Sequence, residues 1–115
     1  MAEFMVVLRG HDPELKTYHR DEARKIMENY YVWVEKLKTE NRYRGGSPLK
    51  GGSKLLSGRK NFVVIMDGPY AEHREALTGY FVIEAAGLAE AVEVAKSCPA
   101  LTHGESVEVL ELDNH

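Results

Sequence analysis

The stretch Asp67-Gly68-Pro69-Tyr70-Ala71-Glu72 decides the fold, because it joins two apolar runs that have the length and composition of β-strands. The first run, Phe62-Val63-Val64-Ile65-Met66, ends at the motif, and the second, Tyr80-Phe81-Val82-Ile83, follows it after a few residues. An acidic residue followed by glycine and proline is typical of a turn. A carboxylate at such a position either shapes the turn or belongs to a site, and both roles are open for Asp67.

Patterns of apolar residues predict the other elements. The run Phe4–Leu8 predicts a strand that is covered on both faces, and apolar residues spaced by three and four from Asp21 to Glu40 predict a helix with Asp21 as its cap. The glycine-rich region 42–60 predicts a short strand, a loop and part of a hairpin. A shorter helix that closes at Cys98-Pro99 and a last strand over 107–112 complete the chain.

This order of elements indicates an α+β protein. A strand, a helix, further strands including 62–66 as a buried one, a second helix and a last strand fold most simply as the ferredoxin-like βαββαβ plan. In this plan an antiparallel sheet carries both helices on one face. A chain of 115 residues is long enough for one core, so we expect residues 1–115 to form a single domain.

The motif and its surroundings resemble the YCII-related family, also called DGPF proteins, with Tyr70 in place of the phenylalanine of the motif. The resemblance also includes the opening strand and the segments 45–49, 79–83 and 107–109, so it covers nearly the whole chain. It implies a dimeric α+β barrel, in which the sheets of two subunits pack face to face. We expect this homodimer because a sheet that is apolar on both faces would leave a large apolar patch in water as a monomer.

The resemblance implies less about the reaction than about the fold. Most of the family has no assigned reaction, although some relatives resemble enzymes with a histidine on the first helix near an aspartate. The helix over 21–40 contains no histidine, and Tyr30 stands where such a residue would face the sheet. Other relatives accompany sigma factors as accessory modules, which implies a non-catalytic dimerisation or regulatory role as the alternative.

Composition and charge exclude several classes of protein. No apolar run approaches the roughly 20 residues that cross a bilayer, and the first residues lack the pattern of a secretory signal, so we expect a cytoplasmic protein that does not bind membranes. Nucleic-acid binding is not expected, because the chain has a net charge of −3 and its basic stretch lacks a recognition-helix pattern.

The charge is distributed unevenly along the chain. Residues 36–60 contain eight basic residues and one acid, whereas residues 84–115 contain seven acids and one base. This difference fits a groove for an anionic ligand, complementarity between elements or subunits, or simply solvated faces.

Five residues are candidates for a site. Asp67 is the candidate acid or base at the sheet edge, and its alternative role is to accept hydrogen bonds from amides of the turn. Arg9, at the end of the first strand, could receive an anionic group. Tyr30 and Tyr80 are expected near a cavity between sheet and helix, and His73 could share the same cleft.

No metal or cofactor is predicted. None of the five histidines lies three or four residues from another on a helix, and the single cysteine, Cys98, is expected to be a small apolar residue at a helix end. The sequence therefore predicts a protein that binds a small organic molecule near Asp67, an anionic one if Arg9 takes part, with proton transfer as the candidate reaction. Whether the protein is an enzyme stays open at this stage.

Overall fold

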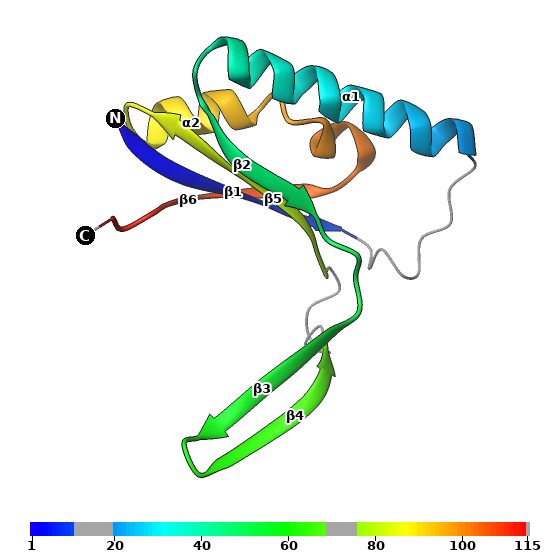
Figure 1. Ribbon diagram of the computed structural model, residues 1–115, viewed down its shortest axis with the longest axis vertical. Coiled ribbons are helices and arrows are strands. Elements are labelled where there is room, and N and C mark those ends of the chain that lie inside the picture. The colour runs from blue at the N-terminus through cyan, green and yellow to red at the C-terminus, as the bar shows by residue number, and fades with distance from the viewer. Residues whose placement is uncertain (11–19, 69–75, 115) are drawn as a thin grey trace.

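A computed structural model describes residues 1–10, 20–68 and 76–114. In this part of the chain an antiparallel sheet carries helices on one face, and a hairpin projects from the sheet (Figure 1). The strands of the sheet are β1 (Ala2–Gly10), β2 (Tyr43–Pro48), β5 (Ala76–Ala85) and β6 (Ser106–Glu111), and those of the hairpin are β3 (Ser53–Arg59) and β4 (Phe62–Gly68). The helices are α1 (Arg20–Thr39), α2 (Leu88–Ala95) and the short 3-10 helix η1 (Pro99–His103).

The strand order of the main sheet is β2-β5-β1-β6, and all neighbouring strands are antiparallel. Without the hairpin, the chain therefore runs β1-α1-β2-β5-α2-β6. Strand β2, which follows α1, and strand β6, which follows α2, lie at opposite edges of the sheet. This is the ferredoxin-like arrangement. The predicted α+β class and ferredoxin-like plan are confirmed.

The core lies between the sheet and the helices. Buried and half-buried residues alternate along β1, so every second side chain faces the helices. Trp33 of α1 packs edge-on against Phe81 of β5 with their ring centroids 5.0 Å apart, and Leu37 is buried one turn further along the helix. Because α2 presents the small residues Ala91 and Ala95 to the core, this helix can approach the sheet closely.

The helix prediction for 21–40 is confirmed within one residue at each end, but two details differ. Asp21 lies inside the first turn instead of capping it, where its negative charge still suits the helix dipole. Met27, which the spacing placed on the apolar face, is 73% exposed, whereas Trp33 is buried. The segment that closes the second helix is as predicted. Cys98 is buried directly before Pro99, where η1 starts, and burial raises the pKa of the Cys98 thiol to about 11.

Within the described residues, the second face of the sheet carries no helix. Register pairs Val7 with Tyr80 and Met5 with Val82, and all four are half-buried. Since paired residues of antiparallel strands share a face, and Phe4 and Val6 point to the helices, these side chains point the other way. We call this surface the open sheet face; it also carries Arg9, Glu108 and Leu110.

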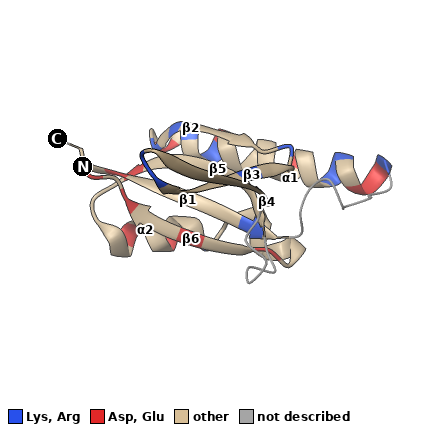
Figure 2. Ribbon diagram, turned by 90° about the horizontal axis from the view of Figure 1, so that it is seen from below, with Lys and Arg blue, Asp and Glu red and all other residues tan. Residues whose placement is uncertain are grey.

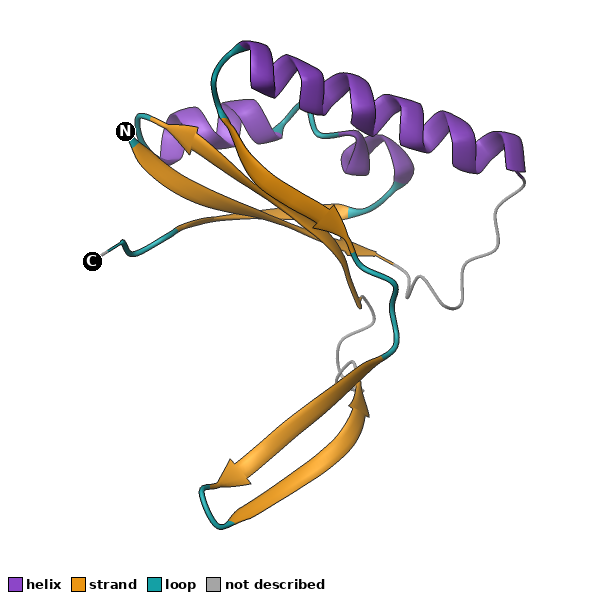
Figure 3. Cartoon of the chain, in the orientation of Figure 1, coloured by secondary structure: helices purple, strands orange, loops and turns teal. Residues whose placement is uncertain are grey.

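The prediction that 62–66 form a buried strand of the main sheet is wrong. These residues lie in β4, which pairs with β3 in a separate two-stranded sheet (Figure 3). Their place beside β5 is taken by β2, whose glycines allow close pairing: a Cβ on Gly46 would lie 2.5 Å from Cδ1 of Phe81. An apolar run identifies a strand, but the partner of that strand depends on such long-range fit.

None of the helices in the described ranges combines the length and the hydropathy that a membrane span requires.

Candidate functional site

A cleft opens between α1 and the end of the sheet where β2 and β5 meet. Its volume is about 570 Å³, within the range of sites for small organic molecules. Most of its lining is apolar or aromatic, and we call it the α1–β2 cleft. The lining side chains of this kind are Leu8, Ile26, Met27, Tyr30, Tyr31, Val34, Tyr43, Pro48, Leu49 and Phe81.

Two glycines leave the sheet side of the cleft without bulky side chains. Gly46 pairs with Phe81, and Gly79 pairs with Leu8 and Pro48. A Cβ on Gly79 would lie 3.2 Å from the carbonyl oxygen of Ser47 and 3.5 Å from Cδ1 of Leu8. Because a side chain at either position would meet neighbouring atoms, the backbone of these two glycines lines the cleft directly. Tyr30, which stacks on Phe81 with ring centroids 6.0 Å apart, forms part of the aromatic wall.

One end of the cleft is polar. The hydroxyl of Thr78 donates a hydrogen bond to Oε1 of Glu105, and both side chains line the cleft. Glu105 can lie there because Gly10 has no side chain: a Cβ at that position would lie 2.7 Å from Cγ of Glu105. Among the described residues that line the cleft, none carries a cationic side chain. The polar end of the cleft therefore presents a carboxylate and a hydroxyl group.

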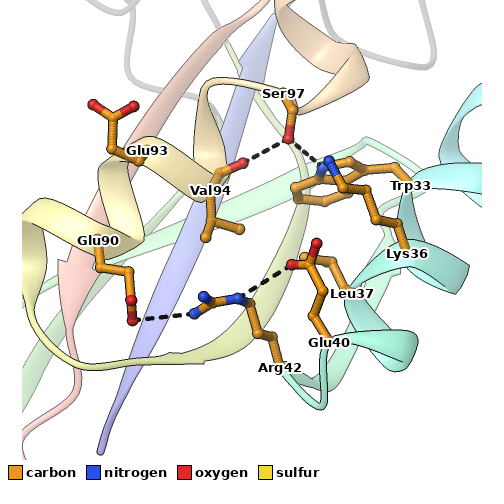
Figure 4. A pocket seen from close by; sticks show the side chains of 9 residues that line it. All are labelled: Trp33, Lys36, Leu37, Glu40, Arg42, Glu90, Glu93, Val94 and Ser97. Carbon is orange, nitrogen blue, oxygen red and sulfur yellow. Dashed lines mark hydrogen bonds and ion pairs between the residues drawn. The ribbon is translucent and has the colours of Figure 1, made fainter.

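A second, shallower cavity of about 290 Å³ lies between the end of α1 and α2 (Figure 4). Arg42 pairs there with Glu40 and Glu90, at 3.2 Å in each case. Glu90 also accepts the backbone N–H of Ala86 at 2.6 Å, and this hydrogen bond and Arg42 lower the pKa of Glu90. These polar groups bind one another, so they brace the start of α2 against β2.

The same cavity contains a hydrogen-bonded chain between the helices. The indole N–H of Trp33 donates to the hydroxyl of Ser97 at 2.9 Å, and that hydroxyl donates to the carbonyl of Val94 at 2.8 Å (Figure 4). The indole of the buried Trp33 is thereby paired, and this contact stabilises the packing of α1 against the end of α2. We therefore interpret this cavity as a structural joint and the α1–β2 cleft as the candidate site.

The structure separates the predicted binding residues. Tyr30 lines the α1–β2 cleft, as expected for a residue between sheet and helix. Tyr80 and Arg9 lie on the open sheet face, where Arg9 forms an ion pair with Glu108. Tyr30 and Tyr80 are therefore on opposite sides of the sheet and do not border one cavity within a single chain. His73 lies outside the described residues.

Asp67 lies on β4, in the hairpin, and not at the edge of the main sheet. It faces Lys54 of β3, forms an ion pair with it, and its side chain is 86% exposed. The hydrogen bond and the charge of Lys54 lower the pKa of Asp67, so its carboxyl is ionised at neutral pH. It does not line the α1–β2 cleft of its own chain.

Sequence reasoning missed the two polar residues of the cleft. Thr78 precedes a predicted strand, and Glu105 follows a predicted helix, so neither stands in a recognisable motif. They meet because β1 pairs with β5 on one side and with β6 on the other. Gly10, at the end of β1, was a weak signal, since a glycine at a strand end often permits close approach of another side chain.

Fold and cleft together define a ferredoxin-like α+β protein with an apolar cleft under its first helix. Residues 3–113 match the model of the YCII-related domain, and the chain belongs to this family. The resemblance inferred from the motif at 67–72 is thereby confirmed. A comparison with curated proteins gives no match.

Proposed function

We propose that this YCII-related protein binds a small, largely apolar organic molecule in the α1–β2 cleft. The observation that supports this most directly is the pairing of an apolar cleft of about 570 Å³ with one polar end at Thr78 and Glu105. Binding sites for small molecules commonly have this composition, because apolar walls provide affinity and a few polar groups set the orientation.

The charge at the polar end suggests the class of ligand. The sequence allowed an anionic ligand if Arg9 took part, but Arg9 lies on the open sheet face and pairs with Glu108. In the cleft a second anion would be repelled by the carboxylate of Glu105, whereas an ammonium or hydroxyl group would donate to it. We therefore propose a neutral or cationic ligand with a hydrogen-bond donor at one end and an apolar body.

The aromatic side chains suit such an apolar body. Tyr30, Tyr31 and Phe81 line the cleft and offer ring faces or edges to an aromatic or aliphatic group. If the ligand carries a cation, the tyrosine rings also attract it. Binding rather than chemistry is the function that this arrangement supports.

The homodimer through the sheet faces and proton transfer by Asp67 remain proposals. The open sheet face supports the first, because Met5, Val7 and Val82 lie on a surface that no helix of the described residues covers. For the second, Asp67 is an exposed carboxylate that can accept a proton, but its ion pair with Lys54 lowers its pKa and makes it a weaker base. The cytoplasmic location stays a prediction from the sequence.

A non-catalytic dimerisation or regulatory module is the alternative. The exposed apolar side chains of the hairpin favour it, because they offer a surface for another protein chain. The two candidates differ in one respect: only the first requires that the α1–β2 cleft take up a small molecule.

Titration with three probes of equal apolar body tests the proposal. We expect 2-phenylethylamine and 2-phenylethanol to bind the cleft and 3-phenylpropanoate to bind at least about tenfold more weakly, because of charge repulsion by Glu105. Chemical-shift changes in 15N spectra locate the site. In Glu105→Gln, the preference for the amine over the carboxylate should fall by about tenfold. Preferential binding of 3-phenylpropanoate, or shifts confined to residues outside the cleft, would refute the proposal.

The variant Asp67→Asn tests the acid–base proposal separately. Because Asp67 is exposed, the substitution should leave the melting temperature unchanged. For any substrate that is found, turnover should then fall while binding in the cleft is retained. Equal turnover by Asp67→Asn and the wild type would exclude Asp67 as the proton-transfer group.

A further inference from the structure

The two halves of α1 are attached to the rest of the protein in different ways. We propose that the first half, residues 20–32, is a lid that closes over a ligand in the α1–β2 cleft, with Met27 and Tyr31 packing on the apolar body of that ligand. The second half, residues 33–39, stays in place as the base of the lid. This inference rests on the proposed function, because the lid needs a ligand on which to close.

The second half of α1 is anchored in the core. Trp33 and Leu37 are buried, and the ring of Trp33 lies edge-on against Phe81 with the ring centroids 5.0 Å apart. The indole N–H of Trp33 donates to the hydroxyl of Ser97 at 2.9 Å, and the carbonyl of Leu37 accepts the N–H of Arg42 at 2.8 Å. These contacts fix this half to β5, to the segment after α2 and to the residue before β2.

The lid segment has no comparable anchor. Of residues 20–32, all of which the structure describes, none is buried. They span about 20 Å of helix, at a rise of about 1.5 Å per residue. Figures 1 and 2 show this end of α1 extending beyond the strands of the main sheet. A helical segment of this length has little stability in water without tertiary packing, so it can move or open locally while the second half stays packed.

The lid segment is apolar on the side that borders the cleft. Ile26 and Tyr30, one helical turn apart, line the cleft, and so do Met27 and Tyr31. Met27 is 73% and Tyr31 is 70% exposed, so two large side chains border the cleft and still face water. Contact with a ligand in the cleft would remove their apolar surface from water, which favours closure of the lid onto the ligand.

The opposite wall of the cleft belongs to the main sheet and is held by hydrogen bonds. Strand β2 pairs with β5 from Tyr43 to Pro48, and β5 pairs with β1 along its whole length. The N–H of Leu49 donates to the carbonyl of Thr78 at 3.0 Å, which extends the pairing past the end of β2. Closure of the cleft should therefore come from movement of α1, because opening the sheet would break these hydrogen bonds.

Hydrogen exchange of the full-length protein tests the movement. In the free protein, amides of residues 24–32 should exchange at least about tenfold faster than those of residues 34–39, relative to their intrinsic rates. Saturation with 2-phenylethylamine should slow exchange at residues 24–32 at least about fivefold. The control amides are those of residues 62–66 in the β3–β4 hairpin, which do not line the cleft and should not change. Equal protection of the two halves in the free protein would overturn the proposal.

Three substitutions on the lid segment identify the side chains that close. Met27→Ala and Tyr31→Ala should each weaken binding of 2-phenylethylamine at least about fivefold, because each removes apolar surface that packs on the ligand. Val32→Ala is the matched control. Val32 is 68% exposed and does not line the cleft, so its replacement should leave the affinity unchanged. Circular dichroism checks that each variant is folded. Equal affinity of all three variants would contradict closure by Met27 and Tyr31.

The lid and the proposed function give different outcomes when they fail. If the wild type binds 2-phenylethylamine in the cleft but exchange at residues 24–32 does not slow, the cleft is a rigid site and the lid is wrong, whereas the proposed function stands. If neither 2-phenylethylamine nor 2-phenylethanol binds in the cleft of the wild type, the proposed function is wrong, and the lid is wrong with it.

Discussion

The hydroxyl of Thr78 donates a hydrogen bond to the carboxylate of Glu105, and this contact joins the start of β5 to the segment before β6 at the polar end of the α1–β2 cleft. The two residues are brought together by β1, which lies between their strands. The contact therefore has two consequences: it ties the end of the sheet together, and it sets the position of the carboxylate that a ligand would meet.

The variant Thr78→Val tests the effect of this hydrogen bond on stability and on ligand binding, with the packing of the side chain preserved. The substitution preserves the shape of the side chain and removes the donor, so we expect a loss of about 1–2 kcal/mol in the free energy of unfolding. Affinity for 2-phenylethylamine should change as well, since Glu105 is less well oriented. Urea denaturation and probe titration measure the two effects. Thr78→Ser retains the hydroxyl and should stay close to the wild type; an equal loss in both variants would contradict the role of the hydrogen bond.

Gly46→Ala should disturb the pairing of β2 with β5. The added methyl group would lie 2.5 Å from Cδ1 of Phe81 and 2.7 Å from the backbone oxygen of Tyr80, so the strand has to move. We expect a loss of about 1–3 kcal/mol in urea denaturation, as for overpacked sites. Gly87→Ala is the matched control, because its backbone is extended and nothing lies within 4 Å of the new methyl group. Gly87 caps α2, so its replacement should cost a smaller amount.

Ser97→Ala should leave the indole N–H of Trp33 without its acceptor. Trp33 is buried, so the unpaired donor should cost about 1–3 kcal/mol of stability. Denaturation followed by fluorescence gives the value, because Trp33 is the single tryptophan of the chain. Ser97→Thr keeps a hydroxyl and should recover most of the loss. If Ser97→Ala matches the wild type, water or another group replaces the acceptor.

Glu90 should make stability depend on pH in the acidic range. The N–H of Ala86, and then Arg42, lower the pKa of Glu90 below its ordinary value of 4.5. A carboxylate with a lower pKa in the folded state stabilises the protein above its unfolded pKa, and this contribution disappears as the pH falls through the folded value. We expect Glu90→Gln to be less stable than the wild type at pH 6, and we expect this difference to shrink as the pH falls below 4.5. A constant difference at every pH would mean that the charge of Glu90 is not responsible.

Residue patterns were sufficient for the regular elements of the main sheet. The spacing around Leu37 predicted α1, the continuous apolar run Phe4–Leu8 predicted β1, and the motif at 67–72 pointed to the family over nearly the whole chain. These features depend on a few neighbouring residues, whose periodicity reflects burial directly. The plan of the fold followed from the order of elements, because short connections and right-handed crossovers leave few alternatives.

The sequence by itself determined the class of fold and the family, and it placed Tyr30 between helix and sheet. Only the tertiary structure decided that residues 62–66 belong to the β3–β4 hairpin, that Tyr80 and Arg9 point away from Tyr30, and that Glu105 meets Thr78 at the cleft. The physical reason is register: which strands pair, and which face each side chain takes, depends on the fit of residues far apart in the chain, such as Gly46 against Phe81.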